Sequence, residues 1–178
     1  MKYSHPSLSS KLLIILILSP SAWAAQEGAK EERLKPSQLP AAVAEAIKSN
    51  CRNCVVDKAT REVENGVTVY DLEFKYGQGE MDVAEDGSVI DRETVVHPNE
   101  VPPAALTAIR KAGGTIRQIV KDEVRAELKD GQIIKLDPPK YLYEADLSKA
   151  TQTAEIQVSP TGQVIEPPYW RRKGTKEN

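Results

Sequence analysis

The sequence predicts an α+β protein of two tandem repeats, each a helix packed on an antiparallel β-sheet of about four strands. Residues 67–76 alternate between apolar and polar side chains, which is the period of a strand with one buried face. We expect the apolar positions of this face to be buried: Tyr70, Leu72, Phe74 and Tyr76. Glycine-containing turns follow at 77–79 and 86–87, so the stretch 67–93 is predicted to be an antiparallel meander.

The same pattern occurs twice in the chain. The second half has counterparts of three segments of the meander: 142–147 matches 69–74, 154–158 matches 80–84, and 159–166 matches 85–91. An alanine-rich segment with an early proline precedes each copy, and proline is favoured in the first turn of a helix. These observations place the two repeats at 36–97 and 98–168.

The N-terminus has the features of a signal peptide at 1–24. Lys2 and Lys11 precede the apolar run Leu12–Leu18, and Ala22 and Ala24 fit the small residues of a cleavage site. The run is much shorter than the roughly 20 residues that cross a bilayer. An uncleaved anchor is the alternative. We expect a periplasmic or secreted protein with no stable membrane insertion after cleavage.

The first repeat is expected to follow a flexible, polar lead-in at 25–35. A helix over Ala41–Ser49 begins after Pro40 and places its apolar residues one turn apart. Val55–Glu64 alternates as a strand, and Asn65-Gly66 is a strong hairpin signal that leads into the meander.

In the second repeat, Gly113-Gly114 ends the helix and Ile116–Leu128 is the next predicted strand. The segment Ile133–Lys140 has no counterpart, and Pro138-Pro139 lacks two backbone donors, so we expect a loop or an edge strand there. Residues 169–178 form a basic tail in which Trp170 should pack at the domain edge. The two helices are expected to bury Val43, Ile47, Leu106 and Ile109 against Tyr70, Leu72, Phe74, Tyr143 and Leu147.

Cys51 and Cys54 are the only cysteines of the chain. In an exported protein they favour a local disulfide that holds the corner after the first helix. A redox dithiol is the alternative, but a helix C-terminus does not lower the pKa of a thiol as a helix N-terminus does. Free thiols are the third alternative. Val55 follows Cys54, which excludes c-type haem attachment, and no metal-ligand set or cofactor motif is present in the sequence.

Acidic residues alternate along the predicted strands. Asp71, Glu73, Glu80 and Asp82 have the strand period, so the polar face of a sheet explains them better than an acid–base pair does. We expect no catalytic residues. The residues that we expect to bind a partner lie on the helix-free face: Asp71, Glu73, Lys75, Glu144 and Asp146.

The doubled unit resembles tandem PepSY-type domains. The first copy reads Leu-Pro-x-Ala-Val-x-x-Ala-Ile, then Val-Tyr-Asp-Leu-Glu-Phe and Glu-Asp-Gly-Ser-Val-Ile, and the second reads Val-Pro-x-Ala-Leu-x-x-Ala-Ile, then Leu-Tyr-Glu-Ala-Asp-Leu and Ser-Pro-Thr-Gly-Gln-Val-Ile. More narrowly, it resembles exported PepSY-like proteins related in fold to β-lactamase inhibitor protein. The resemblance implies a helix on an antiparallel sheet, twice, and a non-enzymatic role. PepSY units in protease propeptides are thought to restrain the peptidase.

The sequence therefore predicts an exported, non-enzymatic protein that binds or restrains a protein partner, such as a peptidase, through the open sheet face. Its formal net charge of −2 gives no sign of nucleic-acid binding. An acidic face should recognise a basic patch on the partner. The alternative is an envelope protein that binds a small ligand or a metal ion through the acidic sheet residues.

Overall fold

The computed structural model describes residues 31–173. The predicted signal peptide, most of the predicted lead-in and the last residues of the tail lie outside the described residues. Within this part of the chain, no helix is long and apolar enough to cross a membrane.

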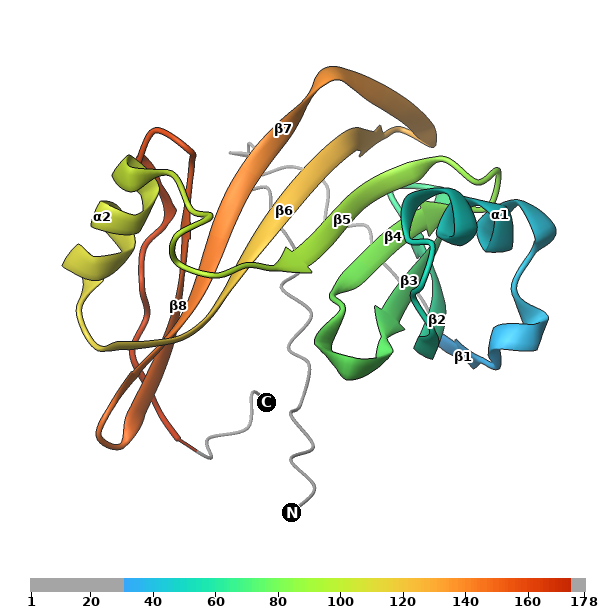
Figure 1. The fold of residues 1–178 in the computed structure, drawn as a ribbon. Helices are drawn as coiled ribbons and strands as arrows, with labels where there is room; N and C mark the ends of the chain where they lie inside the picture. Colours follow the sequence, from blue (N-terminus) through green and yellow to red (C-terminus); the bar gives the residue numbers. More distant parts are fainter. Residues whose placement is uncertain (1–30, 174–178) are drawn as a thin grey trace, which may run out of the picture.

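The described chain consists of a helix followed by strands, and then a second helix followed by strands (Figure 1). The first half contains β1 (Glu32–Leu34), η1 (Pro36–Gln38), α1 (Ala41–Asn50), β2 (Val56–Glu64), β3 (Val67–Phe74), η2 (Lys75–Gly77), β4 (Glu80–Ala84) and β5 (Val89–Val95). The second half contains α2 (Pro103–Ala112), β6 (Thr115–Lys129), β7 (Gln132–Lys149), β8 (Gln152–Val158), β9 (Val164–Glu166) and β10 (Arg171–Arg172).

All strands belong to one antiparallel sheet in the order β1-β2-β3-β4-β5-β6-β7-β8-β10, with β9 on β8. The α+β class is confirmed, but the expectation of a separate sheet in each half is wrong. The halves join because β5 pairs with β6 through residues 93–95 and 120–122. The expected lead-in also ends earlier than predicted, because β1 pairs with β2.

Each helix packs on the same face of the sheet over its own apolar cluster. The first cluster contains Val43, Ala46, Ile47, Ala59, Tyr70, Leu72, Phe74, Met81 and Val83. The second contains Val101, Ala105, Ile109, Ile119, Tyr143, Ala145, Leu147, Ile156 and Val158. The predicted core is confirmed except at two positions. Leu106 is half-buried while Ala105 is buried in its place, and Tyr76 is 90% exposed because the chain turns directly after Phe74.

Truncating Ile109 to alanine should destabilise the protein by about 2–5 kcal/mol, since its side chain is fully buried between α2 and the sheet. Leu106→Ala on the same helix is the matched control and should cost less, because Leu106 is half-buried. Urea denaturation measures both. Equal losses at the two sites would contradict the assignment of the buried helix face.

The β6–β7 hairpin differs from the predicted loop or edge strand. β7 continues on both sides of the two prolines. Its pairing with β6 passes from Val124↔Lys140 to Ala126↔Lys135. Residues 136–139 therefore bulge opposite the single residue Arg125. The prolines are tolerated because a bulged residue needs no N–H for the ladder.

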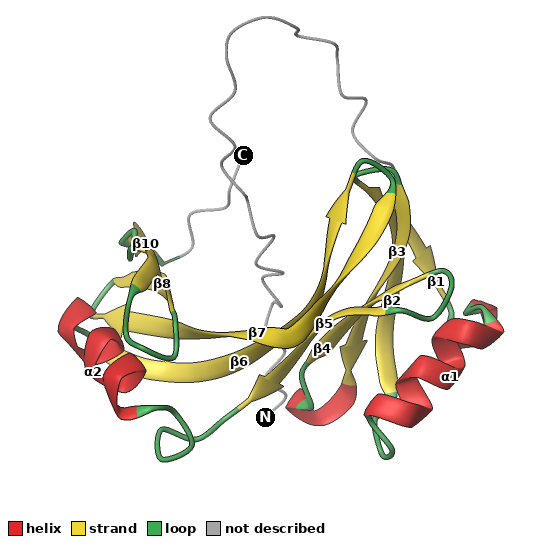
Figure 2. Ribbon diagram, turned by 90° about the horizontal axis from the view of Figure 1, so that it is seen from above, coloured by secondary structure: helices red, strands yellow, loops and turns green. Residues whose placement is uncertain are grey.

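The sheet curls around its helix-free face. The Gly131 amide donates to the Asn65 carbonyl over 2.7 Å, which joins the β6–β7 turn to the β2–β3 turn. A third apolar cluster fills the space behind this contact, with Ala84, Ile90, Ala126, Val67, Leu128 and Ile133. Figure 2 shows the curved sheet with both helices on its outer side. The helix-free face is consequently concave and enclosed at one end.

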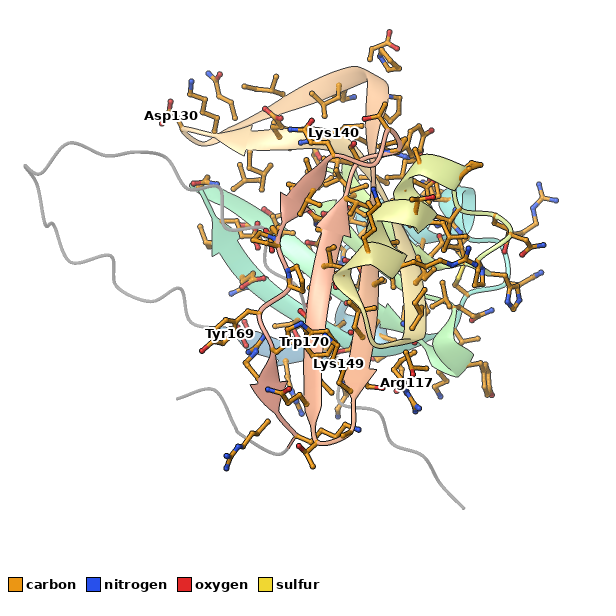
Figure 3. The ribbon with its side chains drawn as sticks, turned by 90° about the vertical axis from the view of Figure 1, so that its left-hand side faces the viewer. Arg117, Asp130, Lys140, Lys149, Tyr169 and Trp170 are labelled. Atoms are coloured by element: carbon orange, nitrogen blue, oxygen red, sulfur yellow. A yellow bond between two sulfur atoms is a disulfide. The ribbon has the colours of Figure 1, made fainter. Side chains whose placement is uncertain are left out.

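The C-terminal segment is tied to the second half. β10 pairs with residues 152–153 of β8, and Trp170 packs on the second cluster, as the sequence predicted. The Lys149 ammonium lies 3.9 Å from the centre of the Trp170 ring, and Figure 3 shows the two side chains together. A Cβ on Gly114 would meet this ring at 2.7 Å, so the docking of the tail requires glycine there.

The corner after α1 is fixed by a disulfide and by cations. Cys51 and Cys54 are joined in the structure, in agreement with the leading prediction. Arg92 of β5 donates to the Asn50 carbonyl over 2.7 Å, and Arg125 of β6 donates to the Asn50 side chain. Cationic groups at a helix C-terminus are favourable because they oppose the negative end of the helix dipole. Arg125 thereby links the second half to the first helix.

Candidate binding face

Strand alternation places a set of carboxylates on the face that the helices leave uncovered. Because Tyr70, Leu72 and Phe74 point to α1, the residues between them point the other way. Residues directly opposite in an antiparallel pair share a face. The pairing of β3 to β6 and the alternation on β7 thus place a set of acids on the concave side, which we call the acidic face: Asp71, Glu73, Glu80, Asp82, Asp91, Glu93, Asp122, Glu144 and Asp146.

The acids of this set on β3 to β6 form two rows across the strands. One row runs Glu73↔Glu80↔Glu93↔Asp122 through β3, β4, β5 and β6. The other row runs Asp71↔Asp82↔Asp91 through β3, β4 and β5. Like charges directly opposite each other destabilise a sheet. Every acid of both rows faces another acid, so the fold accepts this arrangement at a cost in stability.

Burial and mutual repulsion raise the pKa values in the long row. Burial, followed by the charges of Asp71 and Glu73, raises the pKa of Glu80 to about 7. Burial raises the pKa of Glu93 to about 9, with Glu80 and Glu144 as the next causes. The pKa of Asp122 rises to about 6, mainly by burial.

The short row behaves in the same way. Burial raises the pKa of Asp91 to about 7, and the charge of Asp122 contributes next. The pKa of Asp82 also lies well above its ordinary value, through burial and then through Asp91. Removing water from a carboxylate disfavours the charged form, and so does a second carboxylate nearby. The acidic face therefore holds protons near neutral pH.

The structure brings some of the predicted binding residues together and separates others. Asp71 and Glu73 lie at the β3 end of the two rows, and the Glu73 carboxylate pairs with Lys58 at 2.6 Å. Glu144 lies on β7 close enough to Glu93 to raise its pKa. Asp146 is exposed further along β7, opposite Glu155 on β8. Lys75 is not on a strand, because it begins the turn between β3 and β4.

The sequence prediction missed Asp91, Glu93 and Asp122. The first two alternate on β5 at the strand period, so their sharing a face was visible in the sequence. Their place beside Asp122 was not visible, because it depends on the pairing of β5 with β6 across the joint between the halves.

The chemistry of the acidic face favours a cationic ligand. A positive charge placed against the rows would stabilise the ionised carboxylates and relieve their repulsion. Among the described residues, no three acids, histidines or cysteines form a group that could hold a metal ion.

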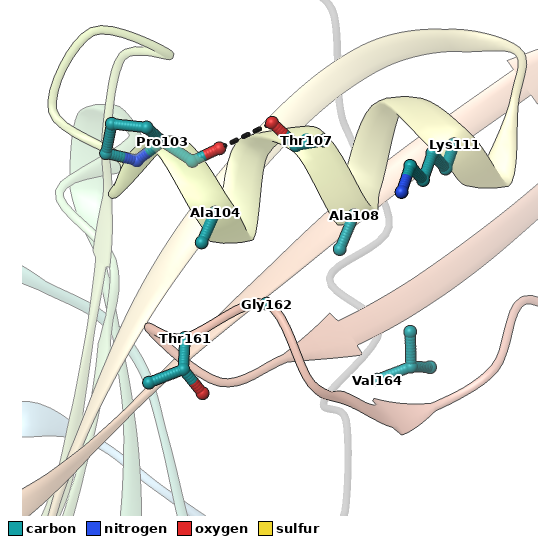
Figure 4. A pocket seen from close by; sticks show the side chains of 8 residues that line it. All are labelled: Pro103, Ala104, Thr107, Ala108, Lys111, Thr161, Gly162 and Val164. Carbon is teal, nitrogen blue, oxygen red and sulfur yellow. Dashed lines mark hydrogen bonds between the residues drawn. The ribbon is translucent and has the colours of Figure 1, made fainter.

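A groove of about 520 Å³ lies elsewhere, between α2 and the loop after β8 (Figure 4). It is lined by Pro103, Ala104, Thr107, Ala108, Lys111, Thr161, Gly162 and Val164. The Thr107 hydroxyl is already used, because it donates to the Pro103 carbonyl over 2.7 Å. Few polar groups converge on this groove, whereas ligand pockets place several where the ligand is held.

Two solved structures from Bacteroides have a similar arrangement of elements. A BLIP-like protein from Bacteroides fragilis aligns with a TM-score of 0.49 at 18% identity, over 82% of this chain and 93% of that one. A DUF2874 family protein from Bacteroides uniformis aligns with a TM-score of 0.46 at 19% identity, over 75% and 88% of the two chains. No protein-family profile and no curated protein sequence matches the chain. The PepSY assignment thus stays a prediction, and the function has to be inferred from this chain's own residues.

Proposed function

We propose that this chain is an exported, non-enzymatic binding protein whose acidic face holds a basic surface of a protein partner, such as a peptidase. The observation that carries the proposal is the run of like-charge pairs across four strands. Such an arrangement costs stability in the free protein. A basic partner would relieve the repulsion between the carboxylates. Partner binding therefore explains an arrangement that the stability of the fold does not explain.

The shape of the face supports a macromolecular partner. The rows extend from β3 to β6, and the curl of the sheet makes the face concave. Charge complementarity over such a surface gives specificity and fast association more than affinity. Acid–base catalysis would instead need a nucleophile, base or metal in fixed geometry beside a substrate pocket.

Reversal of Asp71, Glu73, Glu144 and Asp146 to lysine should abolish binding to a partner captured from envelope extract and then purified. The four lysines would oppose a basic surface, and rising salt should slow association with the unmodified protein. The melting temperature should change little, because the new lysines at 71, 73 and 146 face the remaining acids Asp82, Glu80 and Glu155, while the one at 73 also loses the ion pair with Lys58. Titration calorimetry with the purified partner measures the loss.

The matched control reverses four exposed acids outside the face: Glu45, Asp57, Glu85 and Glu127. Its net charge changes equally, so it separates the acidic face from bulk charge. Binding that survives the first set of reversals, or that is lost equally in the control, would contradict the proposal.

Export implies a mature chain that begins near Ala25 and retains the Cys51–Cys54 disulfide. Intact mass of the exported protein under non-reducing conditions should lack residues 1–24, and the protein should take up alkylating reagent only after reduction. A mass that includes Met1 would refute cleavage, and two reactive thiols before reduction would refute the disulfide.

A further inference from the structure

The turn between β3 and β4 departs from the turn chemistry of two other hairpins of the molecule. Three hairpin turns carry two consecutive residues of positive φ: Asn65-Gly66, Tyr76-Gly77 and Asp130-Gly131. This is the type I′ pattern, whose first central position favours Asn, Asp or Gly. Two turns follow the rule, while the third places a tyrosine at φ 62°.

No packing contact explains this tyrosine. Tyr76 is 90% exposed, and a Cβ on the adjacent Gly77 would meet no atom within 4 Å. The corresponding turn in the second half, between β7 and β8, has Ala150 at its positive-φ position. That turn forms without an aromatic side chain, so the fold does not demand one. A bulky residue held at positive φ without compensating contacts is a sign of function.

Two hydrogen bonds join the turn to the loop that follows α1. The Lys75 amide donates to the Val55 carbonyl over 2.8 Å, and the Gln78 side chain reaches the Asn53 carbonyl at 3.4 Å. Asn53 belongs to the loop closed by the Cys51–Cys54 disulfide. A rigid aromatic anchor loses little conformational entropy on binding.

The side chains around Tyr76 have the composition of a protein-binding hot spot. Val55 is 49% exposed beside the turn, and the charged residues of the two joined loops, Arg52 and Lys75, are both cations. Tyrosine and arginine are enriched among residues that dominate binding energy. In the second half the corresponding turn is bonded instead to the chain's own tail, since Lys173 donates to the carbonyls of Ala150 and Thr151.

We propose that Tyr76 is a docking anchor that inserts into an apolar pocket of a folded protein partner, with acidic groups on the rim of that pocket facing Arg52 and Lys75. The inference rests on the proposed protein-binding function and adds a second contact of opposite charge to the acidic face. The pocket supplies a hydrogen-bond acceptor for the phenol hydroxyl, as buried tyrosines require.

The first test needs only the purified mature protein. Tyr76→Asn restores the preferred type I′ residue and should raise the melting temperature by about 2 °C with an unchanged circular dichroism spectrum. Tyr169→Asn replaces an aromatic residue that is 74% exposed without positive φ, and it should leave the melting temperature unchanged. A lower melting temperature for Tyr76→Asn would give the tyrosine a structural role and overturn the inference.

The second test uses the full chain in cells with the photo-crosslinker p-benzoylphenylalanine at position 76 or, as a control, at 169. One partner protein should be crosslinked by the variant with the crosslinker at 76, and not by the variant with the crosslinker at 169. After its identification and purification, Tyr76→Ala should weaken its binding at least tenfold, and Tyr169→Ala should not change it. No adduct at 76, an adduct between two copies of this chain, or an unchanged affinity would overturn the inference.

The acidic-face reversals in the same binding assay separate the two proposals. Loss of binding by the reversals alone would retain the acidic face and overturn the Tyr76 anchor. Loss by Tyr76→Ala alone would retain the anchor and overturn the acidic face, and loss by neither would overturn both.

Discussion

Replacing Glu93 with glutamine is expected to stabilise the protein at pH 9 by about 2–3 kcal/mol and to leave stability near pH 4 almost unchanged. The pKa of Glu93 rises from 4.5 to about 9 on folding, so the folded chain holds this proton more tightly than the unfolded chain does. The folded state is therefore favoured at low pH, and that advantage is lost as the pH rises from 4.5 toward 9. Glutamine does not ionise, so the variant does not lose this stability as the pH rises. The whole shift would give a larger value, but part of the side chain reaches solvent.

Urea denaturation of both proteins between pH 4 and pH 9 measures the difference. Glu45→Gln on the exposed side of α1 is the matched control, because it makes the same chemical change away from the acidic face. Its stability should follow that of the unmodified protein at every pH. A difference for Glu93→Gln that does not grow with pH would show that the carboxylate is not destabilised by its neighbours.

Local sequence patterns predicted most of the helices and strands. The helices, the meander and the Asn65-Gly66 turn were predicted because their signals lie within a few neighbouring residues. Tyr76 was placed wrongly for the same reason. It continues the alternation of β3, and only the turn at Lys75 removes it from the buried face.

Features that depend on long-range pairing were not predictable. The joint between β5 and β6 merges the two expected sheets, and nothing local to either strand specifies that register. The bulge opposite Arg125 moves the prolines of β7 out of the hydrogen-bonded pairing, and a strand pattern in the sequence does not predict such a bulge. The acidic rows are the sum of such pairings. The alternation in the sequence predicts which face of the sheet each acid lies on. The order of the acids across the strands depends on the strand pairing.

The last expectation concerns the pH dependence of binding. Affinity for the captured basic partner should rise by up to about tenfold per pH unit between pH 6 and pH 8, with protons released on binding. A cationic surface lowers the pKa of the carboxyls that it touches, and these pKa values lie at about 7 for Glu80 and Asp91 in the free protein. At pH 6 the partner must displace their protons, whereas at pH 8 most have already left. Calorimetry in two buffers of different ionisation enthalpy counts the released protons. In Glu80→Gln/Asp91→Asn the rise should flatten, because the two groups whose pKa values lie at about 7 are gone. An affinity that falls from pH 6 to pH 8 would show that the acidic face does not meet the partner.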